Sequence, residues 1–243
     1  MSRQRTIGTP RMGVGPKLVP LPATLLACQH LPDVATELGR ALGLDPERHR
    51  SAGLVTCDQD DALYVALDHA TKFAEVDVVF AKSFYAGSKH ASGPYSGEIM
   101  GILAGGNPDH VAEALWHLRE GLADIHFVTL AGAGPEQPAF FPHVITSTGR
   151  YLSKEAGIPA GAPMAYLIAP PLEATFAIDA ALKAAEVRLL KWLPPPSETN
   201  FAGAYLGGEL HQLQAAAEAF TRAIAEVALT PLSALRRPER FRR

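Results

Sequence analysis

Three acidic residues stand where the sequence changes from an apolar run to a helical pattern: Asp60, Asp61 and Glu173. Carboxylates that line a narrow site of low dielectric constant favour small cations over anions, and organic ammonium compounds are cations at neutral pH. The same placement also suits a simpler role, because acids in the first turn of a helix complement its macrodipole. The sequence alone leaves both roles open.

No other group of residues points to catalysis. The histidines stand apart and lack the spacing of a metal site, and Gly105-Gly106 lacks the neighbouring residues that bind phosphate. No nucleophile stands in a hydrolase motif. The two cysteines, Cys28 and Cys57, exclude a disulfide framework and a cysteine-rich zinc site, and they suit a reducing compartment. We therefore expect no metal, no cofactor and no enzymatic activity. The histidines considered are His69, His90, His126 and His143.

The overall composition is that of a globular protein. Hydrophobic residues make up 47% of the chain and charged residues 19%, a balance that allows a buried core. The net charge of −3 at pH 7 gives no general attraction to nucleic acid or to an anionic membrane. No apolar run approaches the roughly 18 residues that a membrane helix needs, and no targeting segment is recognisable. We expect a soluble protein of the cytoplasm.

The chain contains an internal repeat. Residues 66–76 (ALDHATKFAEV) align without a gap with residues 177–187 (AIDAALKAAEV), at a separation of 111 positions. Further along, the glycine pair at 105–106 aligns with the pair at 207–208, at a separation of 102. The first copy therefore carries an insertion of roughly nine residues, which lies between Lys82 and Gly97.

Each copy has the pattern of a small α/β domain. Both copies read as strand, short helix, strand, helix, strand, strand, helix, and a Gly- and Pro-rich linker at 132–138 separates them. The pattern predicts two sandwiches in which helices cover one sheet (an α+β arrangement within the α/β class). We place an N-terminal extension at 1–19, the first domain at 20–131, the second at 132–231 and a basic tail at 232–243. Three such chains in a ring would present six similar domains around one axis.

Several long sequence strings resemble one known family. Residues 148–153 (TGRYLS), 170–175 (PPLEAT) and 193–200 (LPPPSETN) closely resemble the tandem-domain shell proteins of bacterial microcompartments, in the branch devoted to ethanolamine utilisation. The similarity runs from about residue 20 to about residue 231. It implies two circularly permuted shell domains per chain and a flat, pseudohexameric trimer. Such trimers pack edge to edge with other shell proteins in the facets of a microcompartment shell.

The resemblance also implies roles for individual residues. Asp60, Asp61 and Glu173 would line a small pore that passes metabolites such as ethanolamine, and the inserted loop would close a larger central pore. The loop's sequence suits this role, because its glycines permit movement and its aromatic side chains can fill an opening. An ordinary surface loop is the alternative. The loop residues concerned are Ser83, Phe84, Tyr85, Ala86, Gly87, Lys89 and His90.

Two other functions compete with the shell role. A trimeric protein that binds small amines, or regulates in response to them, would use the same acids without any shell. An enzyme acting on amino alcohols would use Asp60 and Glu173 as acid and base, but no cofactor motif or nucleophile supports it. Assembly into flat sheets distinguishes the shell protein from both.

Overall fold

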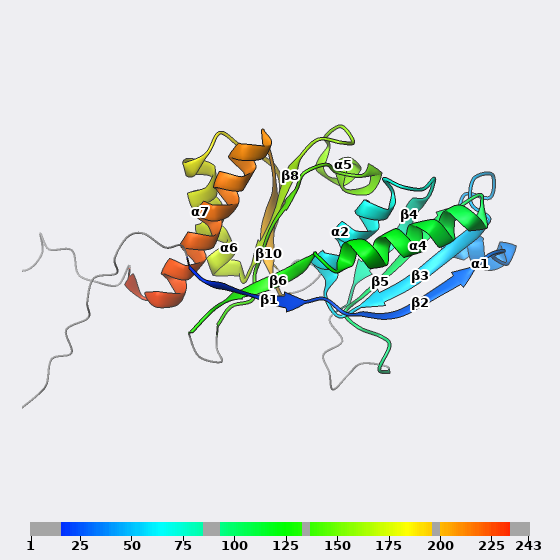
Figure 1. Cartoon of the computed structure of the whole chain (residues 1–243), viewed down its shortest axis with the longest axis horizontal. Helices are drawn as coiled ribbons and strands as arrows, with labels where there is room; N and C mark the ends of the chain where they lie inside the picture. Colours follow the sequence, from blue (N-terminus) through cyan, green and yellow to red (C-terminus); the bar gives the residue numbers. More distant parts are fainter. Residues whose placement is uncertain (1–15, 85–92, 133–136, 196–199, 234–243) are drawn as a thin grey trace, which may run out of the picture.

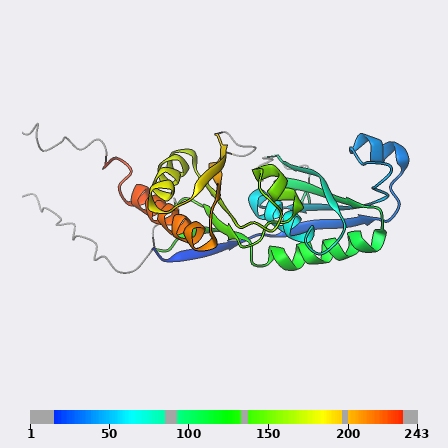
Figure 2. The same ribbon diagram turned by 90° about the horizontal axis from the view of Figure 1, so that it is seen from above.

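Two α/β halves lie side by side along the long axis of the molecule (Figure 1). The structure is a computed structural model, and it describes residues 16–84, 93–132, 137–195 and 200–233. Seen from above, the halves form an elongated row, with α6 and α7 at one end and α1 at the other (Figure 2). In the described ranges, no helix is long and apolar enough to cross a membrane.

The first half is a four-stranded antiparallel sheet with the strand order β2-β3-β5-β4. Its strands are β2 (Leu25–Leu31), β3 (Ser51–Cys57), β4 (Asp77–Ser83) and β5 (Ile99–Gly105). Its helices are α1 (Thr36–Ala41), α2 (Asp60–Ala70) and α4 (Pro108–Leu122), of which α2 and α4 pack against the sheet. The Asn107 side chain accepts a hydrogen bond from the backbone N–H of Asp109, which confirms the predicted start of α4.

The second half repeats this arrangement, with the strand order β7-β8-β10-β9. Its strands are β7 (Phe141–Ile145), β8 (Met164–Ala169), β9 (Arg188–Leu193) and β10 (Ala202–Gly207). Its helices are α5 (Arg150–Ala156), α6 (Pro171–Ala184) and α7 (Leu210–Leu229). Helices α2 and α6 begin 111 positions apart, and α4 and α7 begin 102 apart, so the structure reproduces the separations of the sequence repeat.

A two-stranded sheet connects the halves. Strand β1 (Leu18–Pro22) pairs with β6 (His126–Leu130), and Val128 of β6 forms an isolated bridge with Phe140, next to β7. Strand β1 was not predicted from the sequence, because its two prolines interrupt the strand pattern. Proline is tolerated here because β1 has β6 on one side only and is an edge strand.

Buried hydrophobic side chains pack across the boundary between the two halves. One cluster of buried side chains contains Leu63 and Leu67 of α2 together with Leu152 of α5 and Ile168 of β8. A second cluster, around Phe220, lies mainly between α6, α7 and the second sheet. Because the first cluster draws on both halves, separating them would expose apolar surface, and the halves hold a fixed relative position.

Candidate functional site

The N-terminus of α2 places two carboxylates at the joint between the halves. Strand β3 ends at Cys57, and α2 starts three residues later, so Asp60 and Asp61 stand in its first turn. Both residues are buried, at 6% and 5% exposure, which is unusual for acids. The Asp60 carboxylate accepts a hydrogen bond from the Asp61 backbone N–H at 2.8 Å. Their place in the first turn is compatible with the predicted role of complementing the helix macrodipole. That role does not require burial, so it does not explain why both side chains are buried between the halves.

Each carboxylate also accepts a hydrogen bond from a hydroxyl group. The Ser83 Oγ donates to Asp60 Oδ2 at 3.1 Å, and the Tyr166 hydroxyl, which belongs to the second half, donates to Asp61 Oδ1. Burial raises the pKa of Asp60, and the surrounding hydrogen bonds offset part of this rise. Hydroxyl donors satisfy part of the hydrogen-bonding capacity of a carboxylate without neutralising its charge, so the pair remains suited to a cation.

A cavity of about 560 Å³ opens beside these acids. Its walls come from both halves: α2 and β4 on one side, and α5, β8, β9 and β10 on the other. Four tyrosines and four charged residues supply the polar part of the lining, which suits a small organic cation that carries both charge and apolar surface. These residues are Asp60, Asp61, Tyr64, Tyr151, Glu155, Tyr166, Lys191 and Tyr205.

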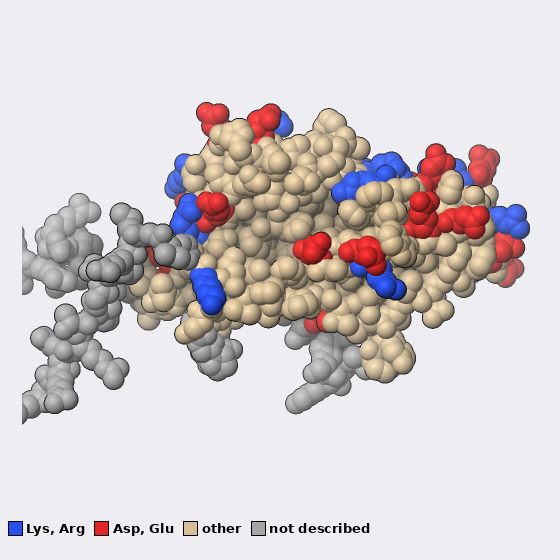
Figure 3. Space-filling model, in the orientation of Figure 1, with Lys and Arg blue, Asp and Glu red and all other residues tan. Residues whose placement is uncertain are grey.

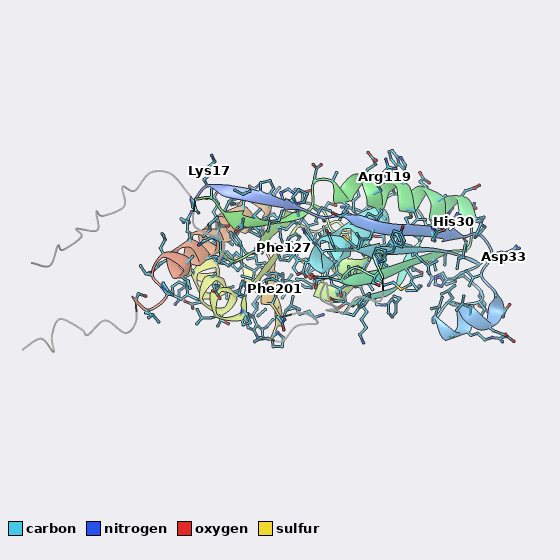
Figure 4. The ribbon with its side chains drawn as sticks, turned by 90° about the horizontal axis from the view of Figure 1, so that it is seen from below. Lys17, His30, Asp33, Arg119, Phe127 and Phe201 are labelled. Atoms are coloured by element: carbon cyan, nitrogen blue, oxygen red, sulfur yellow. The ribbon has the colours of Figure 1, made fainter. Side chains whose placement is uncertain are left out.

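A second, smaller cavity of about 270 Å³ also has Asp60 in its wall. Phe127 and Phe201 lie beside each other here, with ring centroids 5.6 Å apart (Figure 4). The Gln59 side chain holds this wall together, because it donates to the Leu21 carbonyl at 2.7 Å and accepts from the Phe127 backbone N–H at 3.2 Å. Since Asp60 borders both cavities, a passage that joined them would run past its carboxylate.

Glu98 adds a carboxylate that the sequence analysis missed. It lines the smaller cavity together with Asp60. Burial raises the pKa of Glu98, and the negative charges of Asp60 and Asp58 raise it further. The only sequence signal was its place just before β5, directly after the insertion, and no pattern there indicated that it would approach Asp60.

The third predicted acid, Glu173, does not line either cavity. It stands in the first turn of α6 and is partly exposed. Helices α2 and α6 occupy equivalent places in the two halves, so Glu173 is on the second-half counterpart of the helix that carries Asp60 and Asp61. A single chain brings the two aspartates together and leaves Glu173 apart.

The predicted central-pore loop is only partly within the described structure. Ser83 ends β4, and its hydroxyl belongs to the network around Asp60. Phe84 is exposed, and its backbone N–H donates to the Glu98 carbonyl at 2.7 Å. Tyr85, Ala86, Gly87, Lys89 and His90 lie outside the described residues.

The described residues contain no metal-binding cluster, and the buried Cys57 thiol is unreactive. No group of three or more His, Cys, Asp or Glu within the described ranges is placed to hold a metal ion. Burial raises the pKa of the Cys57 thiol to about 12, so this sulfur stays protonated at neutral pH and is a poor nucleophile. Among the described residues of the face in Figure 3, Lys and Arg side chains are interspersed with Asp and Glu.

The sequence and the fold match those of the shell proteins of bacterial microcompartments. No family model matches the chain. The chain is 46% identical over 215 residues to the microcompartment shell protein EutL of Clostridium perfringens. The aligned region covers 86% of this chain and 95% of that protein. EutL of Escherichia coli is 45% identical over 213 residues, with 86% and 94% covered. The chain therefore belongs to the EutL family of bacterial microcompartment shell proteins.

Solved structures agree with this assignment. The crystal structure of the ethanolamine utilisation protein EutL from Leptotrichia buccalis superposes with a TM-score of 0.84 at 46% identity, covering 89% of this chain and 99% of that one. A trimeric microcompartment shell protein, PduB, has a TM-score of 0.65 at 16% identity, with 85% and 89% covered. At that identity, PduB supports the fold alone.

Proposed function

We propose that this chain is a structural tile that assembles as a homotrimer with a roughly sixfold outline and packs edge to edge with other shell proteins. The repeated strand order supports the trimer, because three chains with two similar halves present six similar units around one axis. The tile has no catalytic activity of its own. Its first contribution is therefore structural, as part of the facet of a microcompartment shell.

The second contribution is the passage of small metabolites, with ethanolamine as the favoured candidate. One observation carries this part of the proposal: the buried carboxylate of Asp60 borders two cavities at the joint between the halves. A small ammonium ion that passed there would exchange its hydration shell for carboxylates and hydroxyl groups. Asp61 and Glu98 extend the acidic lining on the two sides of Asp60.

Glu173 takes the corresponding place at the boundary between chains. Helix α6 repeats α2, and in a ring its N-terminus would face the first half of the next chain, as α2 faces the second half of its own chain. Glu173 would then supply an acid at the contact between two protomers. The loop from Ser83 to His90 exists in one half only, so a trimer contains three copies of it around the central axis, where they would control a wider opening.

Assembly tests the structural part of this proposal. We expect sedimentation to give a trimer and electron microscopy of the purified protein to show flat sheets of trimers. A protein that remains a stable monomer at micromolar concentration would contradict the tile. A trimer that binds ethanolamine but never forms sheets, alone or with partner shell proteins, would instead support a small-amine-binding or regulatory protein.

A further inference from the structure

The larger cavity already contains an ammonium group, which belongs to the protein. Lys191 lies on β9, the edge strand of the second sheet, and pairs in register with Tyr205 of β10. Its Nζ lies 2.9 Å from Glu155 Oε2 and 5.8 Å from the centroid of the Tyr205 ring. Lys191, Glu155 and Tyr205 all line the cavity that contains Asp60 and Asp61. The Lys191 ammonium therefore sits between a carboxylate and an aromatic ring.

A carboxylate and an aromatic face are the two groups by which proteins recognise organic ammonium ions. The cavity has acidic groups at two places: Asp60 and Asp61 on the α2 side, and Glu155 on the α5 side. At the first place, the acids accept hydrogen bonds from Ser83 and Tyr166. At the second, Lys191 occupies the position that a ligand's ammonium group would take.

The tyrosines connect the two places. The Tyr166 hydroxyl donates to Asp61, and the Tyr166 and Tyr205 rings meet edge to face, with centroids 4.6 Å apart. On the other side of Tyr205, the Lys191 Nζ that pairs with Glu155 lies 5.8 Å from the centroid of the Tyr205 ring. Tyr166 and Tyr205 therefore form a pair of adjoining aromatic rings between Asp61 and the Lys191–Glu155 ion pair.

We propose that Lys191 fills a second ammonium subsite and so restricts this cavity to ligands with a single ammonium group. The inference rests on the proposed binding of small ammonium ions at Asp60 and Asp61. A diamine would need Glu155 and the face of Tyr205 for its second charge, but Lys191 holds both and also repels a second cation. The preference for ligands with a single ammonium group then arises because Lys191 occupies the second subsite and repels a second cation. It does not require an additional contact to the preferred ligand.

The fold does not require a lysine at this position. The Lys191 side chain is 41% exposed and lies on the edge strand of the second sheet, so its aliphatic part is not needed to fill a buried core. A lysine on a partly exposed edge strand is also easy to replace without loss of folding. Lys191 is the sole cationic side chain of the cavity's described lining, which makes it the position at which to change ligand charge preference.

The test is isothermal titration calorimetry of the trimer with ethanolamine and with linear diamines from ethylenediamine to cadaverine. In K191M, we expect the affinity for at least one diamine, relative to ethanolamine, to rise about tenfold over wild type, because a carboxylate and an aromatic face become available. K191Q repeats the test with a polar side chain. Thermal unfolding and gel filtration check that both variants are folded trimers.

Two control variants define the interpretation. Lys183, which pairs with Asp179 at 2.6 Å on the outer face of α6, is an ion-paired lysine away from the cavity, so K183M should leave the diamine preference unchanged. The double variant E155Q/K191M should lose the gain, because the second carboxylate is absent. An unchanged preference in K191M and K191Q, or a gain that persists in the double variant, overturns the inference. A wild-type protein that does not bind ethanolamine overturns the proposed function instead.

Discussion

The Asp68 carboxylate of α2 accepts a hydrogen bond from the backbone N–H of Gly149, 81 positions along the chain, at 2.6 Å. It also accepts one from Leu152 at 2.8 Å, so a buried acid of the first half caps helix α5 of the second. Gly149 allows the close approach, because a Cβ atom there would lie 2.2 Å from the Asp68 carbonyl oxygen. Arg150 strengthens the joint by donating to the carbonyls of Ala74 and Val76, each at 2.9 Å.

The first prediction concerns this joint. In D68N, the amide NH₂ replaces one acceptor oxygen and faces the backbone N–H donors, so we expect the free energy of unfolding to fall by about 2 to 4 kcal/mol. Urea denaturation followed by circular dichroism measures it. The matched control is D179N at the equivalent position of α6, where the carboxylate is exposed and pairs with Lys183. That change should cost less than about 1 kcal/mol, and equal losses in both variants would contradict the role of Asp68.

The second prediction concerns acid sensitivity. Burial, with the nearby charges of His126 and Lys72, lowers the pKa of His143 to about 4. Between this value and the unfolded value near 6.5, the unfolded state binds more protons, so the folded state loses stability as the pH falls through this range. The loss reaches up to about 3 kcal/mol near pH 4. The raised pKa values of Asp60 and Asp68 act in the opposite direction, so the effect is isolated by comparison with a variant.

That variant is H143Q, which does not titrate in this range. Its free energy of unfolding, measured by urea denaturation from pH 7 to pH 4, should fall less steeply than that of the wild type. Parallel curves for the two proteins would show that His143 is not protonated on unfolding.

The third prediction concerns the loop from Ser83 to His90. Deleting residues 85–92 should leave folding and trimer formation unchanged, because the hairpin already closes before the loop: Ser83 pairs with Ile99, and Phe84 donates to Glu98. We expect an unobstructed opening on the threefold axis of the trimmed trimer, as seen by electron cryomicroscopy. An identical opening in the parent and the trimmed protein would exclude a gating role.

The repeat in the sequence predicted much of the fold, because its two separations locate matching helices and strands. Asn107 and Pro108 identified the start of α4 for a purely local reason, a side-chain cap followed by a residue with a fixed φ angle. Strand β1 was missed, because its pairing with β6 depends on a partner more than 100 positions away. Local patterns carry no information about such partners.

The sequence predicted which acidic residues of α2 belong to the site, but it did not predict the contacts that these residues make. The acids at the start of α2 were identified from their charge and position, whereas the Tyr166 hydroxyl that reaches Asp61 is separated from it by 105 positions. Lys191 joins the site because the buried contacts between the halves and the Asp68 hydrogen bonds fix how the halves meet, whereas Glu98 approaches Asp60 through contacts of the first half with Cys57 and Ser83. Their roles follow from that placement, which the order of residues alone does not reveal.

The most direct test of the central claim is the affinity of the trimer for ethanolamine, measured by calorimetry in the wild type and in D60N/D61N/E173Q. We expect binding to weaken at least about tenfold in the triple variant, because Asp60 and Asp61 no longer supply charge-assisted contacts between the halves and Glu173 no longer supplies one at the proposed contact between protomers. The trimer should remain intact, and D179N should bind like the wild type. Wild-type binding should also weaken as the pH falls through the raised pKa of Asp60, since protonation removes the charge. An unchanged affinity in an intact triple-variant trimer would contradict an acidic passage at this joint.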